Sequence, residues 1–107
     1  MQPIGPRPAV ESNRERLGSL DMREWRAETI DPVAELVDES IASGLFAEDG
    51  QWRYDVLETF DDGKELVETV REWTGTKISR SLAARVEQSK PPLMVRERVR
   101  LRALRAL

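Results

Sequence analysis

The sequence predicts an α+β fold: a three-stranded, mainly antiparallel sheet with about three helices on one face. Two observations lead to this class. Apolar and polar side chains alternate over 52–60 and over 95–103, which is the period of a half-buried strand. Between these segments apolar residues recur at helical spacing behind residues that favour helix starts. The expected order is strand, helix, strand, helix, short helix, strand, and we expect 52–60 and 95–103 to be antiparallel neighbours.

The start of the chain shows no regular period. Residues 1–10 hold three prolines and a glycine, and residues 11–18 are polar, with at most one loose helical turn. We therefore expect residues 1–20 to be a flexible N-terminal arm and residues 21–107 to form a single α+β domain. The segment 22–30 alternates and is predicted to be the first strand, ahead of a turn at 48–51 and the second strand.

The predicted helices are placed by their ends. Asp31 can cap the first helix and Gly44 can terminate it. Asp61 or Asp62 can cap the second, and Asp62 with Glu65 also fits a capping box; Ser79 can cap the third. The side chains expected to face the core are Val33, Leu36, Val37 and Ile41 in the first helix, Leu66, Val67, Val70 and Trp73 in the second, and Leu82, Ala83 and Val86 in the third.

Arginines crowd the last segment, MVRERVRLRALRAL. A helix here would place Val99 and Leu101 about 200° apart and leave no apolar stripe. A strand gathers the valines and leucine on one face and the arginines on the other, so a strand is predicted. The arginine face is a candidate interaction surface, made of Arg96, Arg98, Arg100 and Arg102.

Two interpretations of the arginine face are open. It could be a ladder for phosphates, or a solvated face balanced by acids on neighbouring strands, for which Glu24, Glu28 and Asp55 are the expected partners. The second is favoured because no aromatic side chain is interleaved to stack on bases. The net charge of −3, from 20 acids and 17 bases, also makes nucleic-acid binding an unfavoured function.

Composition removes most catalytic and cofactor chemistry. The chain has no cysteine and no histidine, which excludes disulfides, thiolate metal sites and the commonest general base. Its six glycines are too dispersed for a dinucleotide or phosphate loop. Of metal sites, composition leaves open only one in which carboxylates bind magnesium or calcium. We expect no cofactor, no metal site and no catalytic residue. No apolar run approaches the ~20 residues of a membrane span, so a cytoplasmic protein without membrane contact is expected.

The aromatic residues allow two interpretations. Trp25, Trp52, Tyr54 and Trp73 could line a small pocket between sheet and helices. Alternatively they are simply the core, since large aromatic side chains dominate burial in small domains. The core interpretation is favoured, with Trp52 and Trp73 expected to meet.

About half of the chain resembles a known family. After a strand come F-D-D-x-x-E-L, W-x-G-T-x-I, a short helix, a proline pair and an arginine-rich strand. The matching residues are Phe60, Asp61, Asp62, Glu65, Leu66, Trp73, Gly75, Thr76, Ile78, Pro91, Pro92, Val99 and Leu101. This pattern resembles the C-terminal region of S-adenosylmethionine-dependent class I methyltransferases, although Ser79 stands where that family more often has proline. The likeness implies a small antiparallel αβ unit related or accessory to such enzymes. The cofactor-binding half has no counterpart, so no cofactor residue is carried over.

The functional expectation is a non-enzymatic interaction or regulatory module. Its partner would be an unknown protein or a second copy of the chain, contacted through the mixed-charge sheet face or a sheet edge. The alternative is a small-molecule-binding or methyltransferase-related accessory domain that uses the aromatic pocket. Nucleic-acid binding through the arginine strand is a remote third function.

Overall fold

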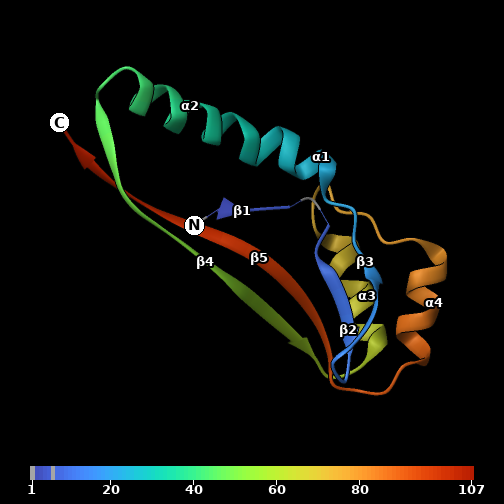
Figure 1. Cartoon of the computed structure of the whole chain (residues 1–107). Coiled ribbons are helices and arrows are strands. Elements are labelled where there is room, and N and C mark those ends of the chain that lie inside the picture. Colours follow the sequence, from blue (N-terminus) through green and yellow to red (C-terminus); the bar gives the residue numbers. More distant parts are fainter. Residues whose placement is uncertain (1, 6) are drawn as a thin grey trace.

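Figure 1 shows the chain in a computed structural model that describes residues 2–5 and 7–107. The fold is α+β, as predicted, and its sheet is antiparallel. The strands are β1 (Gln2–Pro3), β2 (Ala9–Ser12), β3 (Glu15–Ser19), β4 (Phe46–Phe60) and β5 (Leu93–Ala106). The helical segments are α1 (Arg23–Trp25), a π-helical turn (Arg26–Ile30), α2 (Asp31–Ala42), α3 (Gly63–Glu72) and α4 (Arg80–Gln88).

β5 is the central strand of the sheet. Along one edge it pairs with β4 over almost its whole length, from Ala106 opposite Phe46 to Leu93 opposite Phe60. Along its other edge it pairs first with β2 and then with the short β1. The predicted antiparallel pairing of 52–60 with the last strand is confirmed. Within residues 2–5 and 7–107, however, the sheet has five strands where three were expected.

The N-terminal segment contributes three of these strands. β2 and β3 form a hairpin whose turn residues, Asn13 and Arg14, have positive φ angles of 46° and 70°, as a two-residue primed turn requires. Val10 of β2 is completely buried. Residues 9–19 are therefore part of the sheet and not the expected arm or loose helical turn. The prolines among residues 1–10 led to the prediction of an arm, although proline is compatible with edge strands and strand ends.

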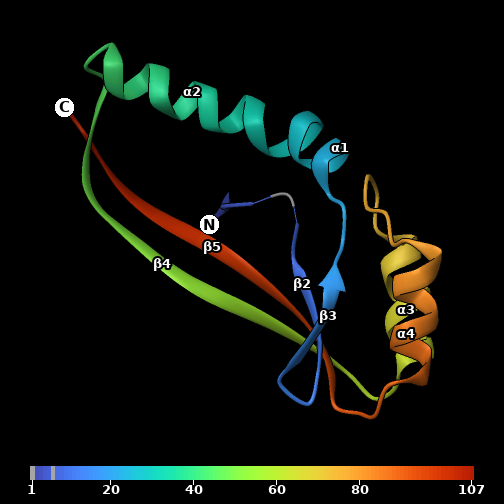
Figure 2. The same cartoon turned by 45° about the vertical axis from the view of Figure 1, so that its right-hand side comes forward.

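The hydrophobic core lies at one end of the molecule. There α3 and α4 pack against β2, β3 and the core-side ends of β4 and β5 (Figure 2). The predicted inward faces of α3 and α4 are confirmed. The buried cluster consists of Val10, Leu20, Phe60, Leu66, Val67, Val70, Leu82, Ala83, Val86, Leu93 and Val95, with Leu17, Trp73 and Ile78 packed against it.

Both core helices begin at their predicted caps. The Asp62 carboxylate accepts a hydrogen bond from the N–H of Glu65 at 2.8 Å. The Ser79 hydroxyl accepts one from the N–H of Leu82 at 3.1 Å. Each cap satisfies a backbone donor that the first helical turn leaves without a partner.

Residues 23–30 are helical, so the first strand predicted over 22–30 is wrong. The N–H of Asp31 bonds to the carbonyl of Arg26, five residues earlier, which makes a π turn ahead of Pro32. Proline has no N–H to donate to the preceding helical turn, and a π turn is one way for a helix to continue through such a position. Asp31 consequently lies inside a continuous helical segment and does not cap it.

The C-terminal end of α2 follows the prediction. Gly44 has a φ of +80°, and the N–H of Leu45 bonds to the carbonyl of Ser40 at 3.0 Å. Together with the bond from Gly44 to Ile41, this is the Schellman ending that glycine favours.

Beyond the core, β4 and β5 continue as a ribbon, which β1 joins only at Val99 and Arg100. The molecule measures 53 × 24 × 16 Å with a radius of gyration of 16.5 Å, against about 13 Å for a compact chain of this length. In Figures 1 and 2, α2 runs alongside the outer half of the ribbon, far from α3 and α4. We expected all the helices to lie on one face of the sheet, and this prediction is wrong.

Candidate interaction surface

Exposed apolar side chains gather on one face of the outer ribbon. Trp52, Tyr54 and Val56 alternate along β4 and are 55%, 42% and 37% exposed. Leu101 of β5 lies directly opposite Trp52 and is 42% exposed. We call these four residues the ribbon face. Toward the core the same face is buried by α3 and α4, and Val99, opposite Tyr54, is also buried. The four residues of the ribbon face are themselves partly exposed.

The edge of β4 adjoins the ribbon face. Among the described residues β4 pairs with β5 alone, and twelve of its fifteen residues are exposed. Half of its backbone N–H and C=O groups therefore point outward along a free edge, which is a template for another strand. A bulge between Glu48 and Gly50 disturbs the far end of β4. The strand contains no proline and no lysine, two devices that commonly protect exposed edges.

Gly50 shapes the outer end of the ribbon face. A Cβ atom at this position would lie 2.9 Å from Cη2 of the Trp52 indole. The ring therefore lies across the Gly50 backbone, where any side chain would displace it. Absence of a side chain at residue 50 keeps the indole along the strand and leaves its other surface exposed.

The arginine face is engaged by carboxylates of the same chain. Arg96 binds Glu11 at 2.6 Å and Asp55 at 3.0 Å, and Arg98 lies 3.5 Å from Asp55. The hydrogen bond from Arg96 lowers the pKa of Asp55, and the bond to Glu11 raises the pKa of Arg96. Neutralisation within the chain favours the solvated-face interpretation over a phosphate ladder.

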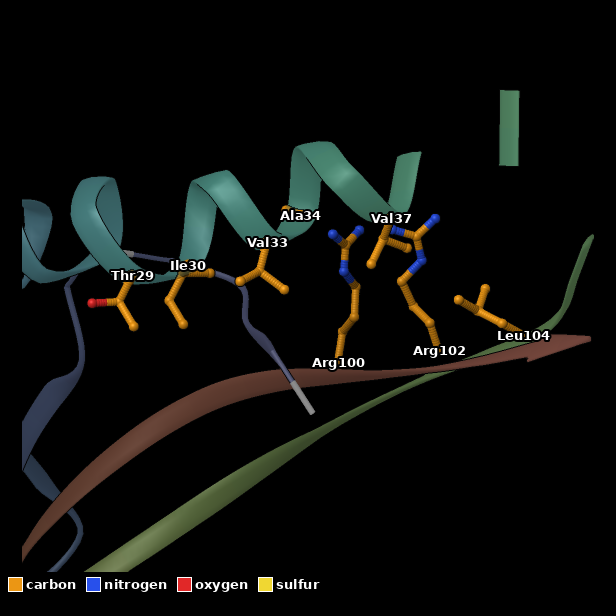
Figure 3. A pocket seen from close by; sticks show the side chains of 8 residues that line it. All are labelled: Thr29, Ile30, Val33, Ala34, Val37, Arg100, Arg102 and Leu104. Atoms are coloured by element: carbon orange, nitrogen blue, oxygen red, sulfur yellow. The ribbon is translucent and has the colours of Figure 1, made fainter. Parts of the chain in front are cut away.

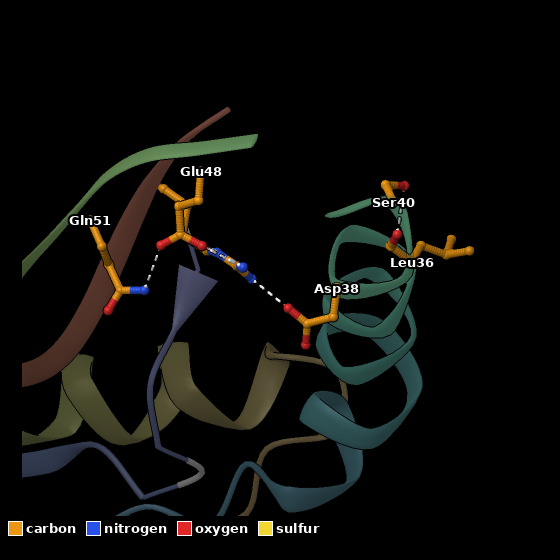
Figure 4. Close-up of polar contacts among 6 residues, drawn as sticks. Leu36, Asp38, Ser40, Glu48 and Gln51 are labelled. Carbon is orange, nitrogen blue, oxygen red and sulfur yellow. Dashed lines mark hydrogen bonds and ion pairs between the residues drawn. The ribbon is translucent and has the colours of Figure 1, made fainter. Parts of the chain in front are cut away.

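Arg102 joins α2 to the ribbon. Its side chain is only 12% exposed and binds Asp38 of α2 at 2.9 Å and Glu48 of β4 at 2.7 Å. Figure 4 shows both carboxylates turned toward this contact, with Gln51 donating to Glu48 from the side at 3.2 Å. The pKa of Arg102 is raised, chiefly by Glu48.

A half-open cleft of about 350 Å³ lies between α2 and the arginine face. Figure 3 shows apolar side chains of the helix opposite arginine side chains of β5. Its lining residues are Thr29, Ile30, Val33, Ala34, Val37, Arg100, Arg102 and Leu104. Leu36, predicted to face the core with Val33, is 63% exposed and does not line this cleft. Of the two arginines that line the cleft, Arg102 is already held by two acids.

The four predicted pocket residues do not come together. Trp73 packs against the core, and Trp25 lies beside Gly75, whose carbonyl accepts from the Trp25 N–H at 3.3 Å. Trp52 and Tyr54 lie on the open ribbon face, eight and six residues from Phe60 along β4. Eight residues of strand span roughly 26 Å, so Trp52 and Trp73 do not meet. None of the four lines any of the described cavities.

Two acidic residues, Glu58 of β4 and Glu97 of β5, lie between the ribbon face and the core. Glu97 is half-buried, and this burial raises its pKa; the neighbouring Glu58 raises it further, while Arg26 opposes the effect. Glu97 faces Val56 across the ribbon, so this pair borders the ribbon face on its core side.

Within the described ranges, 2–5 and 7–107, no three acidic side chains gather where they could hold a metal ion. None of the helices described there is long and apolar enough to cross a membrane. No protein-family model matches the chain, and neither a curated protein nor a solved structure matches it significantly.

The sequence did not predict that Arg96 would bind Glu11, or that Arg102 would bind Asp38 and Glu48. Glu11 lies on a strand that was expected to be an arm, Asp38 on the polar side of a helix, and Glu48 in a segment expected to be a turn. Of the expected partners, Asp55 is confirmed, whereas Glu24 and Glu28 belong to helical segments outside the sheet. Glu48 would have been placed beside Arg102 if β4 had been expected to continue through the bulge and not to begin after a turn at 48–51.

Proposed function

We propose that this chain is a non-enzymatic protein-interaction module whose contact surface is the free edge of β4 together with the ribbon face. The observation that carries this proposal is the exposure of a fifteen-residue strand along its free edge, with Trp52, Tyr54 and Val56 beside it. Strand addition to such an edge supplies backbone hydrogen bonds, and exposed aromatic side chains supply most of the affinity at protein interfaces.

Other observations support the same surface. Tryptophan and tyrosine are enriched at interfaces, and contiguous exposed apolar patches commonly mark binding sites. The arginine face, the other surface considered, is occupied by intrachain ion pairs and covered in part by α2. The residues that carry the methyltransferase likeness act mainly in the core and its caps, and they add no ligand site of their own.

The proposal is tested by site-specific photo-crosslinking in cells of the source organism. A photoreactive phenylalanine analogue replaces Tyr54 on the contact surface or, as the control, Glu87 on the exposed side of α4. We expect a discrete adduct, identifiable by mass spectrometry, at position 54 but not at position 87. Trp52→Glu in the same chain should abolish that adduct. Equal labelling at both positions, or adducts that ignore the Trp52 change, would reject the proposed surface.

A further inference from the structure

β4 carries a self-complementary pattern centred on Tyr54. On either side of it stand Arg53 and Asp55, which have opposite charges, and then Trp52 and Val56, which are both apolar. When two identical antiparallel strands are related by a twofold axis at residue 54, the numbers of facing residues sum to twice 54. Arg53 of each copy then faces Asp55 of the other, and Trp52 faces Val56.

We propose that β4 pairs in this register with β4 of a second copy, joining two five-stranded sheets across a twofold axis. The inference rests on the proposed function and names the partner as the chain itself. A twofold contact uses the same surface on both copies, so it must be self-complementary in this way.

Neighbouring registers are less favourable. The twofold axis must pass through a residue, because facing residues in a sheet lie on the same side of it. An axis at Arg53 or Asp55 sets that residue against its own charge. An axis at Trp52 sets Asp49 against Asp55, and an axis at Val56 gives no pair of opposite charges. Like charges directly opposite one another destabilise a sheet. Among these five registers, the one at Tyr54 alone gives opposite-charge pairs without facing like charges.

The surroundings of Arg53 favour a carboxylate from outside. Within its own sheet Arg53 faces Arg100 of β5, which places two positive charges opposite one another. Its hydrogen bond to Gln51 is long, at 3.3 Å. In the paired sheet, Asp55 of the other copy lies on the open side of Arg53. Asp55 already contacts Arg96 at 3.0 Å and Arg98 at 3.5 Å. A carboxylate has about four acceptor positions, so Asp55 can bind Arg53 of the other copy as a third arginine while retaining Arg96.

The pairing also buries those sides of the apolar side chains that point toward the other copy. Trp52, Tyr54 and Val56 of each copy come beside the same residues of the other, so two half-exposed strips become one continuous patch. Both β4 edges are used in a closed contact, and growth stops at two copies. Head-to-tail pairing of β4 with the free end of β5 would instead continue into a fibre.

Single cysteines test the register directly, since the chain has none of its own. In this register residue 54 faces itself at roughly 5 Å between Cα atoms, within reach of a disulfide. Residue 59, exposed on the same strand, is roughly 34 Å from its counterpart. Under mild oxidation Tyr54→Cys should form a linked dimer of twice 12.3 kDa, and the control Thr59→Cys should remain single. Equal linkage of both variants, or of neither, overturns the register.

Sedimentation equilibrium gives a second measurement that needs no disulfide. The unmodified chain should sediment as a dimer, and Arg53→Asp, which sets acid against acid twice, should raise the dissociation constant at least tenfold. Arg80→Asp makes the same charge change on the exposed first turn of α4 and should leave it unaltered. Circular dichroism establishes that both variants are folded. A dimer that tolerates Arg53→Asp as well as Arg80→Asp overturns the proposed pairing.

These results separate failure of this inference from failure of the proposed function. A chain that is monomeric at all concentrations but gives the position-54 adduct with a different protein overturns self-pairing and leaves the interaction module standing. A monomeric chain with no such adduct overturns both.

Discussion

Replacing Gly63 by alanine should destabilise the fold by about 2–3 kcal/mol, although alanine is the better helix former. Gly63 is the first residue of α3 and is buried against α4. A Cβ atom there would lie 2.2 Å from the Val86 carbonyl oxygen and 2.8 Å from Cα of Glu87. These are backbone atoms, so the conflict cannot be relieved by turning a side chain.

The magnitude follows from two opposing effects. Exchange of glycine for alanine in a helix gains at most about 1 kcal/mol. Against this, an oxygen and a methyl carbon need more than 3 Å of separation, so the two helices must part by about 1 Å. Overpacking in a well-packed interior costs about 1–3 kcal/mol, and backbone that cannot yield raises the cost toward or beyond the upper end. The clash therefore outweighs the gain in propensity.

Urea and thermal unfolding measure this change, with Gly18→Ala as the matched control. At Gly18 the nearest atom is Cδ1 of Leu82, at 2.9 Å, and that leucine end can move. We expect Gly63→Ala to lower the melting temperature by about 10 °C, and Gly18→Ala by much less. If Gly63→Ala proves as stable as the unmodified chain, the close backbone contact between α3 and α4 is wrong.

Three further changes probe other contacts. Arg102→Ala should cost about 1–2 kcal/mol and speed amide exchange throughout α2, because it removes the charged link to the ribbon; the exposed Arg105→Ala should do neither. Glu97→Gln should stabilise the chain at pH 7 by less than about 1 kcal/mol. The folded-state pKa of Glu97 is raised, so its ionisation opposes folding as pH rises above the ordinary glutamate value. The gain should vanish near pH 4, and a gain independent of pH would contradict this origin. Asp62→Ala should cost about 1 kcal/mol in urea unfolding by removing the α3 cap, whereas Asp62→Asn should retain most of it.

The elements predicted correctly are those in which local signals agree with one another. In α3, the cap at Asp62, the apolar spacing through Leu66 and Val70, and the stop near Gly75 all indicate one helix. In β5, the two-residue period excludes a helix and fixes which side chains share a face. Such segments need no knowledge of their neighbours.

The elements predicted wrongly depend on distant parts of the chain. β2 is a strand because β5 offers it an edge, and its four residues are too few to show a period. The segment 22–30 alternates as a strand does, yet the helical frame of α2 extends back through it across Pro32. The exposure of Trp52 and Tyr54 on β4 was not predicted, for a related reason. Its aromatic residues were assigned to the core or a pocket, and sequence period gives the shared face without saying what covers it.

What covers each face of the ribbon is the reason to expect that the chain pairs with itself. The sequence suggested that the apolar face of the β4–β5 ribbon is covered and that its arginine face is open. On the outer half the structure has the opposite arrangement: α2 and its acids lie over Arg102, while Trp52 and Tyr54 are 55% and 42% exposed. Apolar area is worth about 25 cal/mol per Å² when it is removed from water, and a two-stranded ribbon alone is marginal. A second copy would add to both contributions, because its Trp52, Tyr54 and Val56 would pack beside the apolar strip and its β4 would extend the sheet. The ribbon should therefore be more protected from amide exchange at high protein concentration than at low, and the α3–α4 core should show no such dependence. Equal protection of the ribbon at both concentrations would mean that β5 and α2 suffice to hold it.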